Sequence, residues 1–360
     1  MRSVFFYLPN LNSISTSKED FLQRLNGYGK SVFFNSNGEV RSITLLTNTK
    51  VSSHFDYLQI IHLPRNAFSR FRKIHKHIGD TRPNVTLVAG NNFNALLFCL
   101  IQRFFSSRVR VQASVHGKLD LILHEVGVKG FVKRFVIKRL LPYVDSLRLV
   151  DENEIDIATT EFRLSKTKIF VAPVPVRLPD NIAAFSQVRK RSIGFVGRFH
   201  EERGVEEWLK IAEHLSKIDS EVEFHVIGDG PLRNLLETTL VGFTHKAHFW
   251  GFLHQDELDR AWPEIGVLLV CAPSESYGMA IRESLVHAVP VVARENSSSL
   301  SIKKVVPELV STYLNPEEAA ENILAALNKS YKQEWFEEYL DDLRTSQERS
   351  LDLLARSWLK

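Results

Sequence analysis

The chain has 360 residues and a formal net charge of +4, and 44% of its residues are hydrophobic and 24% charged. These values are typical of soluble globular proteins. A chain of this length exceeds the length at which a single domain with one hydrophobic core is usual, so two domains are expected. The charge is uneven, because residues 1–180 contain 26 Lys and Arg against 14 Asp and Glu, whereas residues 181–360 contain 20 against 28. The basic half favours an anionic partner, and charge alone leaves open a phosphorylated acceptor, an acidic membrane surface or nucleic acid.

Three features bear on where the protein works. No apolar run approaches the ~18 to 20 residues that a membrane span requires. The start, "MRSVFFYLPN", lacks a convincing cleavage site and is interpreted as a first strand rather than a signal peptide. Cys99 and Cys271 both lie in apolar runs, which is typical of buried free thiols in a reducing compartment. A soluble, cytoplasmic protein is expected.

Along the chain, short β-branched or aromatic runs alternate with longer amphipathic stretches. The first half contains "SVFFYL", "VTLVAG", "VRVQASV", "SLRLV" and "KIFVAPV", and the second half contains "SIGFVG", "VEFHVIG", "AHFWG", "GVLLVCA" and "VPVVA". Apolar strands that alternate with helices predict parallel α/β sheets covered on both faces. Both halves carry this pattern, so the fold class is α/β with one parallel sheet in each half.

A proline-rich stretch separates the halves. "APVPVRLPDNIAAFSQVRKRS" holds three prolines and then a polar, basic approach to the next strand, which predicts an interdomain linker at roughly 173–191. The expected domains are 1–172 and 192–335. Residues 336–360 are helical by composition and period, and such a helix can pack back across the junction.

The second half has the clearer winding. "GVEEWLKIAEHLSKI" predicts an amphipathic helix, and the strand "VEFHVIG" runs into "DGPLRNLLETTL", where Pro231 suits the first turn of a helix. Ligands bind outside the carboxyl ends of strands in open α/β sheets. The loops after Val196, Ile227, Trp250 and Cys271 are therefore expected to converge on a site.

One of these loops carries two carboxylates. In "APSESYGMAIRESLVHAVPVVA" a strand ends, Gly278 permits a tight backbone and a helix follows, with Glu275 before the helix and Glu283 inside it. Free N–H groups near Tyr277 to Ala280 make an anion site. The first carboxylate, the N–H cluster and the second carboxylate together span on the order of 10 Å. A nucleotide sugar presents matching groups in the same sequence, namely sugar hydroxyls, diphosphate and ribose hydroxyls. In the alternative, Glu275 complements the helix dipole and Glu283 pairs with His287.

The preceding loop supplies cations. In "GFVGRFHEERGVEEW", Arg198 follows Gly197, and Arg203 precedes Gly204 at the start of a helix. Two guanidiniums at a helix N-terminus can neutralise a diphosphate leaving group without a metal. Alternatively, Arg203 pairs only with Glu201 or Glu207. "VIGDGPLR" adds Gly228, although no full dinucleotide fingerprint is present.

These motifs resemble glycosyltransferase family 4, the group 1 glycosyltransferases, which are retaining enzymes of the GT-B fold. From about Ser192 to Ala293 the resemblance rests on "GRFHEERG", "GDGPLR", "WGFLHQDEL" and "ESYGMAIRE". It implies a GT-B fold of two Rossmann-like domains whose parallel sheets face a central cleft. It also implies that Arg198 and Arg203 bind the donor phosphates, that Glu275 contacts the transferred sugar and that Glu283 contacts the ribose.

The first half resembles the family less closely. "VRVQASVHG" is similar to the family's strand ending in a histidine beside the donor sugar, so the resemblance assigns His116 to the site, and a purely structural histidine stays open. The family's glycine-rich loop after its first strand is missing from "YLPNLNSISTS". Val289 stands where the family usually has glycine, and "ENSSSLS" where it usually has a Gly-Gly loop. Altered donor selectivity is one expected consequence.

Residues 128–141 form a basic amphipathic pattern, "VKGFVKRFVIKRLL". Such a helix can lie on an acidic membrane surface, as in relatives that glycosylate lipid-linked acceptors. An ordinary domain helix with its apolar face in the core shows the same period. Both interpretations stay open at this point.

The sequence thus predicts a retaining hexosyltransferase that moves a sugar from a nucleotide diphosphate sugar to a sugar or lipid-linked acceptor, in cell-envelope or extracellular polysaccharide or glycolipid biosynthesis. No cofactor, no essential metal and no nucleic acid are expected, and the protein is cytoplasmic, with contact to the inner face of the membrane through 128–141. A non-catalytic GT-B binding subunit and a nucleotide-sugar epimerase or hydrolase remain alternatives. The expected catalytic residues are His116, Glu275, Arg198 and Arg203, and the expected donor-binding residues are Gly197, Arg198, Arg203, Gly228, Tyr277, Gly278, Met279, Ala280 and Glu283.

Overall fold

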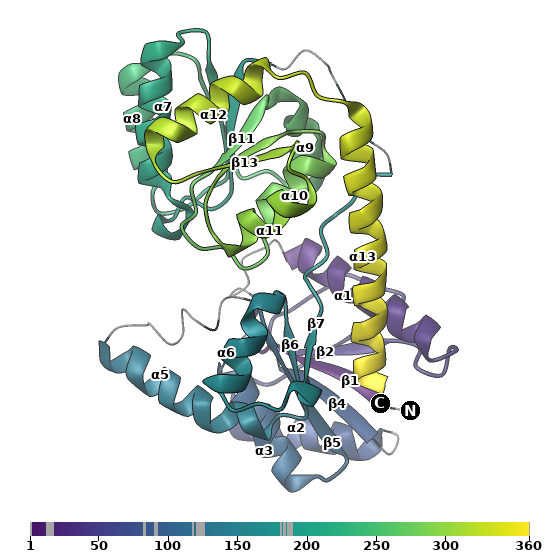
Figure 1. Cartoon of the computed structure of the whole chain (residues 1–360). Coiled ribbons are helices and arrows are strands. Elements are labelled where there is room, and N and C mark those ends of the chain that lie inside the picture. Colours follow the sequence, from purple (N-terminus) through teal and green to yellow (C-terminus); the bar gives the residue numbers. More distant parts are fainter. Residues whose placement is uncertain are drawn as a thin grey trace. The chain divides into compact units, whose positions relative to one another are not determined.

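The computed structural model describes residues 2–11, 18–81, 84–89, 93–116, 119, 127–180, 182, 185 and 190–359. The chain divides into an N-terminal unit, Met1–Pro175 with Ser346–Lys360, and a C-terminal unit, Val176–Thr345. Each unit is built on one parallel sheet with helices on its faces (Figure 1). The expectation of two Rossmann-like α/β domains is confirmed.

The sheet of the N-terminal unit has the order β3-β2-β1-β4-β5-β6-β7, and every neighbouring pair is parallel. Its strands are β1 (Arg2–Tyr7), β2 (Ile43–Thr47), β3 (Leu58–His62), β4 (Asn84–Ala89), β5 (Val109–Val115), β6 (Ser146–Leu149) and β7 (Ile169–Val171). Its helices are α1 (Lys18–Asn35), α2 (Ala67–Asp80), α3 (Phe93–Phe105), α5 (Gly127–Leu140) and α6 (Ile155–Thr160), with short 3-10 helices at Leu141–Tyr143, Glu152–Glu154 and Lys166–Lys168.

Two buried clusters cover the faces of this sheet, because successive residues of a strand point to opposite sides. Phe5 of β1 packs in one cluster with Ile74 of α2. Its neighbour Phe6 packs in the other with Leu25 of α1 and Trp358 near the C-terminus. The alternation of large apolar residues in the first strand therefore builds two layers of core.

The sheet of the C-terminal unit has the order β10-β9-β8-β11-β12-β13, again with parallel neighbours throughout. Its strands are β8 (Ser192–Val196), β9 (Glu223–Ile227), β10 (Ala247–Gly251), β11 (Val267–Val270), β12 (Val291–Arg294) and β13 (Val310–Tyr313). Its helices are α7 (Val205–Ile218), α8 (Arg233–Phe243), α9 (Gln255–Ala261), α10 (Met279–Val286), α11 (Ser297–Val305) and α12 (Pro316–Asn328), with 3-10 helices at Glu201–Arg203 and Trp262–Glu264.

Helices cover both faces of this second sheet (Figure 1). Trp208 of α7 packs with Ile193 of β8 on one face, and Leu285 of α10 packs with Leu268 of β11 on the other. The regular winding of strand and helix places every strand's carboxyl end at the same edge of the sheet.

The last helix, α13 (Gln333–Leu359), contributes to both units. Its final residues are tied to the N-terminal sheet by buried hydrogen bonds, since the Trp358 indole donates to Gln112 Oε1 at 2.6 Å and the Thr86 hydroxyl donates to the Trp358 carbonyl at 2.8 Å. In the stretch expected as a linker, Val176 and Ile182 are buried in a core cluster of the C-terminal unit.

The structure differs from the expected elements in three strands and one helix start. β2, β3 and β13 have no counterpart among the predicted runs. Helix α8 begins at Arg233, so Pro231 lies before the helix rather than in its first turn. Cys99 and Cys271 are buried free thiols, as expected. No helix in the described part of the chain combines the length and apolar character that crossing a bilayer demands.

Candidate functional site

The centre of the C-terminal sheet is its topological switch point. Strands β8 and β11 are neighbours there, β9 and β10 continue on one side, and β12 and β13 continue on the other. The loop after β8 leads to α7, and the loop after β11 leads to α10. Ligands of open α/β sheets bind where two such loops part. Nearly all the predicted site residues lie on these two loops and on α10.

The loop after β8 is fixed against the loop after β9. The N–H of Gly197 donates to the Ile227 carbonyl at 3.0 Å. A Cβ added to Gly228, whose φ is +137°, would lie 1.9 Å from the Gly197 carbonyl oxygen, so the two backbones can approach this closely only with glycine there. Arg198 extends from this loop, with its side chain 50% exposed, and pairs with Glu202.

A second close approach joins the loops after β8 and β11. Gly204 adopts a left-handed conformation with φ of +68°, and a Cβ there would lie 2.1 Å from the Cys271 carbonyl oxygen. The preceding residue, Arg203, is thereby held beside the loop after β11, where its guanidinium forms an ion pair with Glu275. The Glu275 side chain is only 9% exposed and that of Arg203 is 35% exposed. The two loops of the switch point therefore meet in one partly buried ion pair.

The alternative in which Arg203 pairs only with Glu201 or Glu207 is wrong. Glu207 instead pairs with Arg294 and accepts a hydrogen bond from the Tyr313 hydroxyl at 2.9 Å. The Nε of Arg203 is buried and has no acceptor within the described part of the chain. Buried N–H donors are nearly always hydrogen-bonded in folded proteins, so this donor fits an anionic ligand.

The N-terminus of α10 supplies further donors. Gly278 is its N-cap, with φ of 70° and ψ of 50°, and no side chain caps the first turn. Helix α11, by contrast, is capped by Asn296, whose side chain accepts from two backbone N–H groups. The N–H groups at Met279 and Ala280 are thus left without a side-chain cap, and both residues are partly exposed. An uncapped helix N-terminus is a site for a phosphate group.

Arg282 holds Tyr277 in place at the start of this helix. Arg282 was not among the residues predicted from the sequence. Its guanidinium carbon lies 4.0 Å from the centre of the Tyr277 ring, and its Nε donates to the Tyr277 carbonyl at 3.0 Å. A second nitrogen donates to the Tyr339 hydroxyl at 3.2 Å. Burial raises the pKa of Tyr277, with Arg282 acting in the opposite direction. The turn before α10 is therefore held rigidly.

Glu283 lies in the second turn of α10 and is partly exposed. The ring of His287, proposed above as its partner, contacts two other groups. Its Nδ1 lies 2.7 Å from the backbone carbonyl of Glu283, and its Nε2 lies 3.3 Å from Asp259. Glu275 and Glu283 thus stand before and after the free N–H groups, in the order that the sequence predicted.

His116 directly follows β5 in the N-terminal unit and is partly buried. Burial, followed by the positive charges of Arg148 and Arg24, lowers the pKa of His116 to about 3. Arg148 is 2% exposed and donates to the carbonyls of Ala172 and Pro173 at 2.7 and 2.8 Å. The imidazole is therefore neutral at neutral pH. His116 belongs to the N-terminal unit, whereas the other predicted residues lie in the C-terminal unit.

Two departures from the family pattern have structural explanations. The left-handed residue before β12 is Ala288, with φ of 60°, so the position that favours glycine is Ala288 and not Val289. Val289 is 2% exposed and packs in the core. In place of a Gly-Gly loop, Asn296 caps α11 and also donates to the Ala272 carbonyl at 3.1 Å. This ties the loop after β12 to the loop that carries Glu275.

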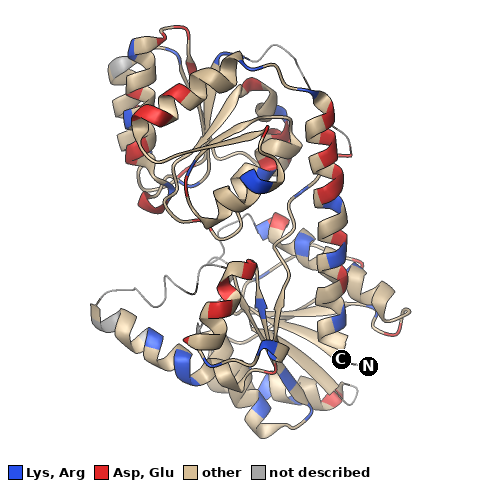
Figure 2. Cartoon of the chain, viewed as in Figure 1, with Lys and Arg blue, Asp and Glu red and all other residues tan. Residues whose placement is uncertain are grey.

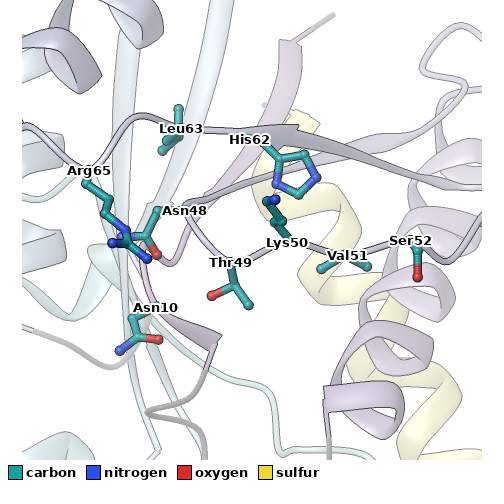
Figure 3. Close-up of a pocket in the computed structure, with 9 residues that line it drawn as sticks. All are labelled: Asn10, Asn48, Thr49, Lys50, Val51, Ser52, His62, Leu63 and Arg65. Carbon is teal, nitrogen blue, oxygen red and sulfur yellow. The ribbon is translucent and has the colours of Figure 1, made fainter.

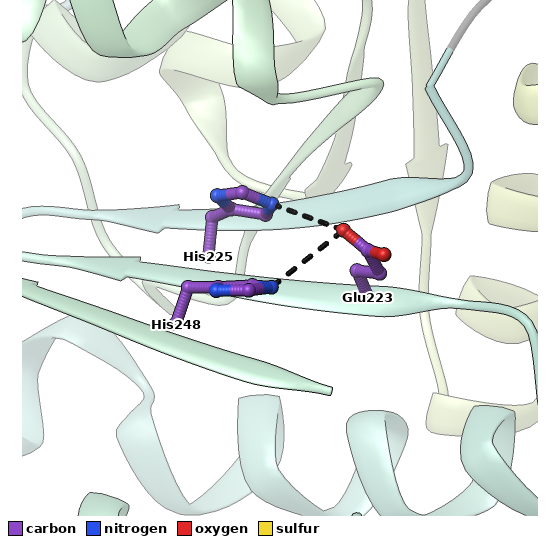
Figure 4. A group of neighbouring side chains, drawn as sticks. All are labelled: Glu223, His225 and His248. Atoms are coloured by element: carbon purple, nitrogen blue, oxygen red, sulfur yellow. Dashed lines mark ion pairs between the residues drawn. The ribbon is translucent and has the colours of Figure 1, made fainter. Parts of the chain in front are cut away.

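One group of side chains in this unit resembles a metal site but does not fit one (Figure 4). Ligand atoms of Glu223, His225 and His248 lie within 4.8 Å of one another. The two rings are stacked, with centroids 4.8 Å apart and 28° between their planes, and the Nε2 atoms of His225 and His248 both face one oxygen of Glu223, at 3.8 and 3.6 Å. The Trp250 indole, which can only donate, lies 3.2 Å from Nδ1 of His225. The neutral ring therefore carries its proton on Nε2, and burial lowers its pKa.

Together, the two parallel-sheet units have the GT-B fold, and the C-terminal unit carries the switch-point site. Residues 190–330 match the family model described as "Glycosyl transferases group 1". The chain is 31% identical over 122 residues to a 2-deoxystreptamine glucosyltransferase from Streptomyces kanamyceticus, covering 33% of this chain and 32% of that protein. It is 31% identical over 105 residues to the sulfoquinovosyl transferase SQD2 of Arabidopsis thaliana, covering 29% and 20%. The chain thus spans about a third or less of the curated relatives it matches.

Solved structures resemble the fold over its whole length. HepE of Anabaena in complex with UDP-glucose has a TM-score of 0.70 at 11% identity and covers 100% of this chain and 99% of its own. The apo lipopolysaccharide outer core galactosyltransferase WaaB has a TM-score of 0.68 at 12% identity, with 99% of each chain covered. At these identities the likeness establishes the fold.

Proposed function

We propose that the protein is a retaining, metal-independent hexosyltransferase that moves a sugar from a nucleotide diphosphate sugar to an acceptor hydroxyl. The observation that carries the proposal is the Arg203–Glu275 ion pair, which joins both loops of the switch point beside the uncapped N-terminus of α10. The match of residues 190–330 to a glycosyl transferase model supports it. So do the structures of HepE in complex with UDP-glucose and with UDP, whose fold this chain resembles.

In this proposal the donor lies along the start of α10. Arg198, Arg203 and the N–H groups of Met279 and Ala280 bind the diphosphate, because guanidinium groups and free helix N–H groups are the donors that phosphate prefers. Glu275 accepts hydrogen bonds from the hydroxyls of the transferred sugar, and Glu283 accepts them from the ribose. The donor's diphosphate competes with Glu275 for Arg203, and it also satisfies the buried Nε of that arginine.

The chemical step breaks the bond between the anomeric carbon and the diphosphate oxygen, which keeps the electron pair. The acceptor hydroxyl forms the new bond on the same face of the sugar and gives its proton to the departing diphosphate. Positive charge placed where negative charge develops is usually the largest catalytic contribution. Arg198 and Arg203 supply that charge.

We also propose that the protein is cytoplasmic and that α5 contacts an acidic membrane surface, which would bring it to a lipid-linked acceptor of envelope polysaccharide or glycolipid synthesis. Phe131 is 60% exposed and Phe135 56% exposed. Arg134 and Arg139 lie over their rings, 5.8 and 5.7 Å from the centroids. Figure 2 shows the basic residues along this helix. Exposed aromatic rings beside basic side chains are typical of helices at a membrane interface.

Product analysis tests the proposal. The protein is incubated with UDP-, GDP- and ADP-sugars and a panel of acceptors, and nucleotide release and glycoside formation are followed by chromatography. An α-linked product from an α-linked donor, identified by its anomeric proton coupling, is the expected result. Free sugar alone would indicate a hydrolase, an altered donor sugar an epimerase, and nucleotide binding without turnover a non-catalytic subunit.

A further inference from the structure

A large pocket lies in the N-terminal unit, and none of the residues assigned above lines it (Figure 3). Its volume of about 1080 Å³ slightly exceeds the ~300 to 1,000 Å³ that is typical of small-molecule sites. It is lined by His62 at the end of β3 and by the segments that follow β1, β2 and β3, which contribute Asn10, Asn48, Thr49, Lys50 and Arg65. These segments lie at the carboxyl edge of the sheet, where ligands of α/β proteins bind.

Backbone hydrogen bonds fix the walls of this pocket. The N–H of Asn48 donates to the Pro9 carbonyl at 2.9 Å, and the N–H of Leu11 donates to the Thr49 hydroxyl at 3.0 Å, which joins the segments after β1 and β2. The N–H of Leu63 donates to the Thr47 carbonyl at 2.7 Å, which joins the segments after β2 and β3. The pocket is therefore formed before any ligand arrives, and a preformed site loses little entropy on binding.

The charge of the pocket has one sign. Its charged lining residues are Lys50 and Arg65, and no Asp or Glu lines it. Residues 48–76 contain six Lys and Arg and a single acid, Asp56. Within the described part of the chain, no carboxylate forms an ion pair with Lys50 or Arg65. An unneutralised lysine and arginine in one concave site favour an anion, and the arginine can bind it through two nitrogens.

Two further cationic side chains contact the backbone of the residues that line the pocket. Lys73 of α2 donates to the His62 carbonyl at 2.7 Å, and Arg70 donates to the Arg65 carbonyl at 3.2 Å. They hold the backbone that presents the lining side chains and add to the positive potential. The lining amides and hydroxyl of Asn10, Asn48 and Thr49 are the groups that hydrogen-bond sugar hydroxyls.

We infer that this pocket binds the acceptor and that the acceptor carries an anionic group, a phosphate or a carboxylate, which Lys50 and Arg65 neutralise. The assignment of the pocket to the acceptor rests on the proposed transferase function. Its preference for a negatively charged sugar rests on the pocket alone. The amide and hydroxyl side chains then contact the neutral part of the same molecule.

Direct binding without donor tests the preference. Glucose 6-phosphate, glucuronate and glucose are titrated calorimetrically into the full chain, into Lys50→Gln/Arg65→Gln, and into Arg72→Gln/Lys76→Gln. The last variant is the matched control, because it removes the same two charges from exposed positions of α2 that do not line the pocket. Circular dichroism establishes that all three proteins are folded.

The expected result is that at least one charged sugar binds at least about tenfold more tightly than glucose, and that the pocket variant loses at least about tenfold while the control does not. The charged sugar that binds more tightly identifies the group as phosphate or carboxylate. Equal binding of charged and neutral sugars, or an equal loss in the control, would overturn the inference.

A parallel nucleotide titration separates the two proposals. If Lys50→Gln/Arg65→Gln keeps wild-type affinity for the nucleotide and no charged sugar binds the wild type, the pocket inference fails while the proposed function stands. If a charged sugar binds in a Lys50- and Arg65-dependent way and no nucleotide binds, the preference of the pocket holds and the transferase proposal fails.

Discussion

Replacing Glu275 with glutamine is expected to tighten the binding of the nucleoside diphosphate, whereas replacing Arg203 with methionine is expected to weaken it. In the structure the carboxylate of Glu275 forms an ion pair with the guanidinium of Arg203. A diphosphate that binds Arg203 must displace this carboxylate or share the arginine with it. The change Glu275→Gln removes the competing charge and keeps the shape of the side chain.

The magnitudes follow from the exposure of the pair. The Arg203 side chain is 35% exposed, so solvent weakens the competing ion pair to about 1 kcal/mol, and Glu275→Gln tightens diphosphate binding by about fivefold. Arg203→Met removes a charged hydrogen bond to phosphate, about 1.5 to 3 kcal/mol, which weakens binding by about 10- to 150-fold. Isothermal titration of the preferred nucleoside diphosphate measures both values.

Arg191→Met is the matched control for this experiment. Arg191 lies at the opposite end of β8 and pairs with Asp219, and the two side chains are 41% and 12% exposed, close to the values for Arg203 and Glu275. This variant loses an equivalent ion pair outside the site and should bind the nucleotide as the wild type does. If Glu275→Gln weakens diphosphate binding as much as Arg203→Met does, the two groups do not compete, and the assignment of Arg203 to phosphate is refuted.

Three further predictions follow from other parts of the molecule. Gly204→Ala places a Cβ 2.1 Å from the Cys271 carbonyl at a positive φ, so it should destabilise the protein by at least about 2 kcal/mol in urea unfolding and abolish nucleotide binding, whereas Gly242→Ala, with open space around it, should do neither. The pKa of His116 is about 3 in the folded protein against 6.5 in the unfolded chain. Because the unfolded chain binds the proton first as the pH falls, the free energy of unfolding should decrease from pH 6.5 toward pH 3. His116→Asn should reduce this slope by up to about 1.4 kcal/mol per pH unit, and an unchanged slope would contradict the prediction. Phe131→Ser/Phe135→Ser should reduce sedimentation with phosphatidylglycerol vesicles, whereas Phe104→Ser, 84% exposed on α3, should not, and equal losses would argue against α5 as the contact.

Much of the C-terminal unit could be predicted because its strands are continuous apolar runs between amphipathic helices. The elements that were missed have weaker patterns. β2, "ITLLT", contains two threonines that are nevertheless buried, and the Thr47 hydroxyl donates to the Pro9 carbonyl at 3.3 Å. The burial of Thr47 depends on this hydrogen bond to the segment after β1, which the local sequence does not show. Missing β2 and β3 also concealed the pocket at their ends, although "NTK" and "HLPR" were its signal in the sequence.

The sequence suggested the candidate residues but not the contacts that they make in the structure. The two glutamates and two arginines were proposed from motif spacing, and the alternative considered for Arg203 was a pair with Glu201 or Glu207, which are nearer in the sequence. The actual partner, Glu275, is 72 residues away. It is brought close by the pairing of β8 with β11 and by the left-handed turn at Gly204, and both are tertiary features that spacing cannot reveal.

The measurement that tests the central claim most directly is the thermal stability of the wild type and of Glu283→Ala with UDP, GDP, ADP and their sugar conjugates. The account predicts that one nucleotide, at about 100 times its dissociation constant, stabilises the wild type by about 2.7 kcal/mol and that Glu283→Ala loses most of this effect. Stabilisation of the wild type by none of them, or equal stabilisation of Glu283→Ala, would contradict a nucleotide-sugar site at the start of α10.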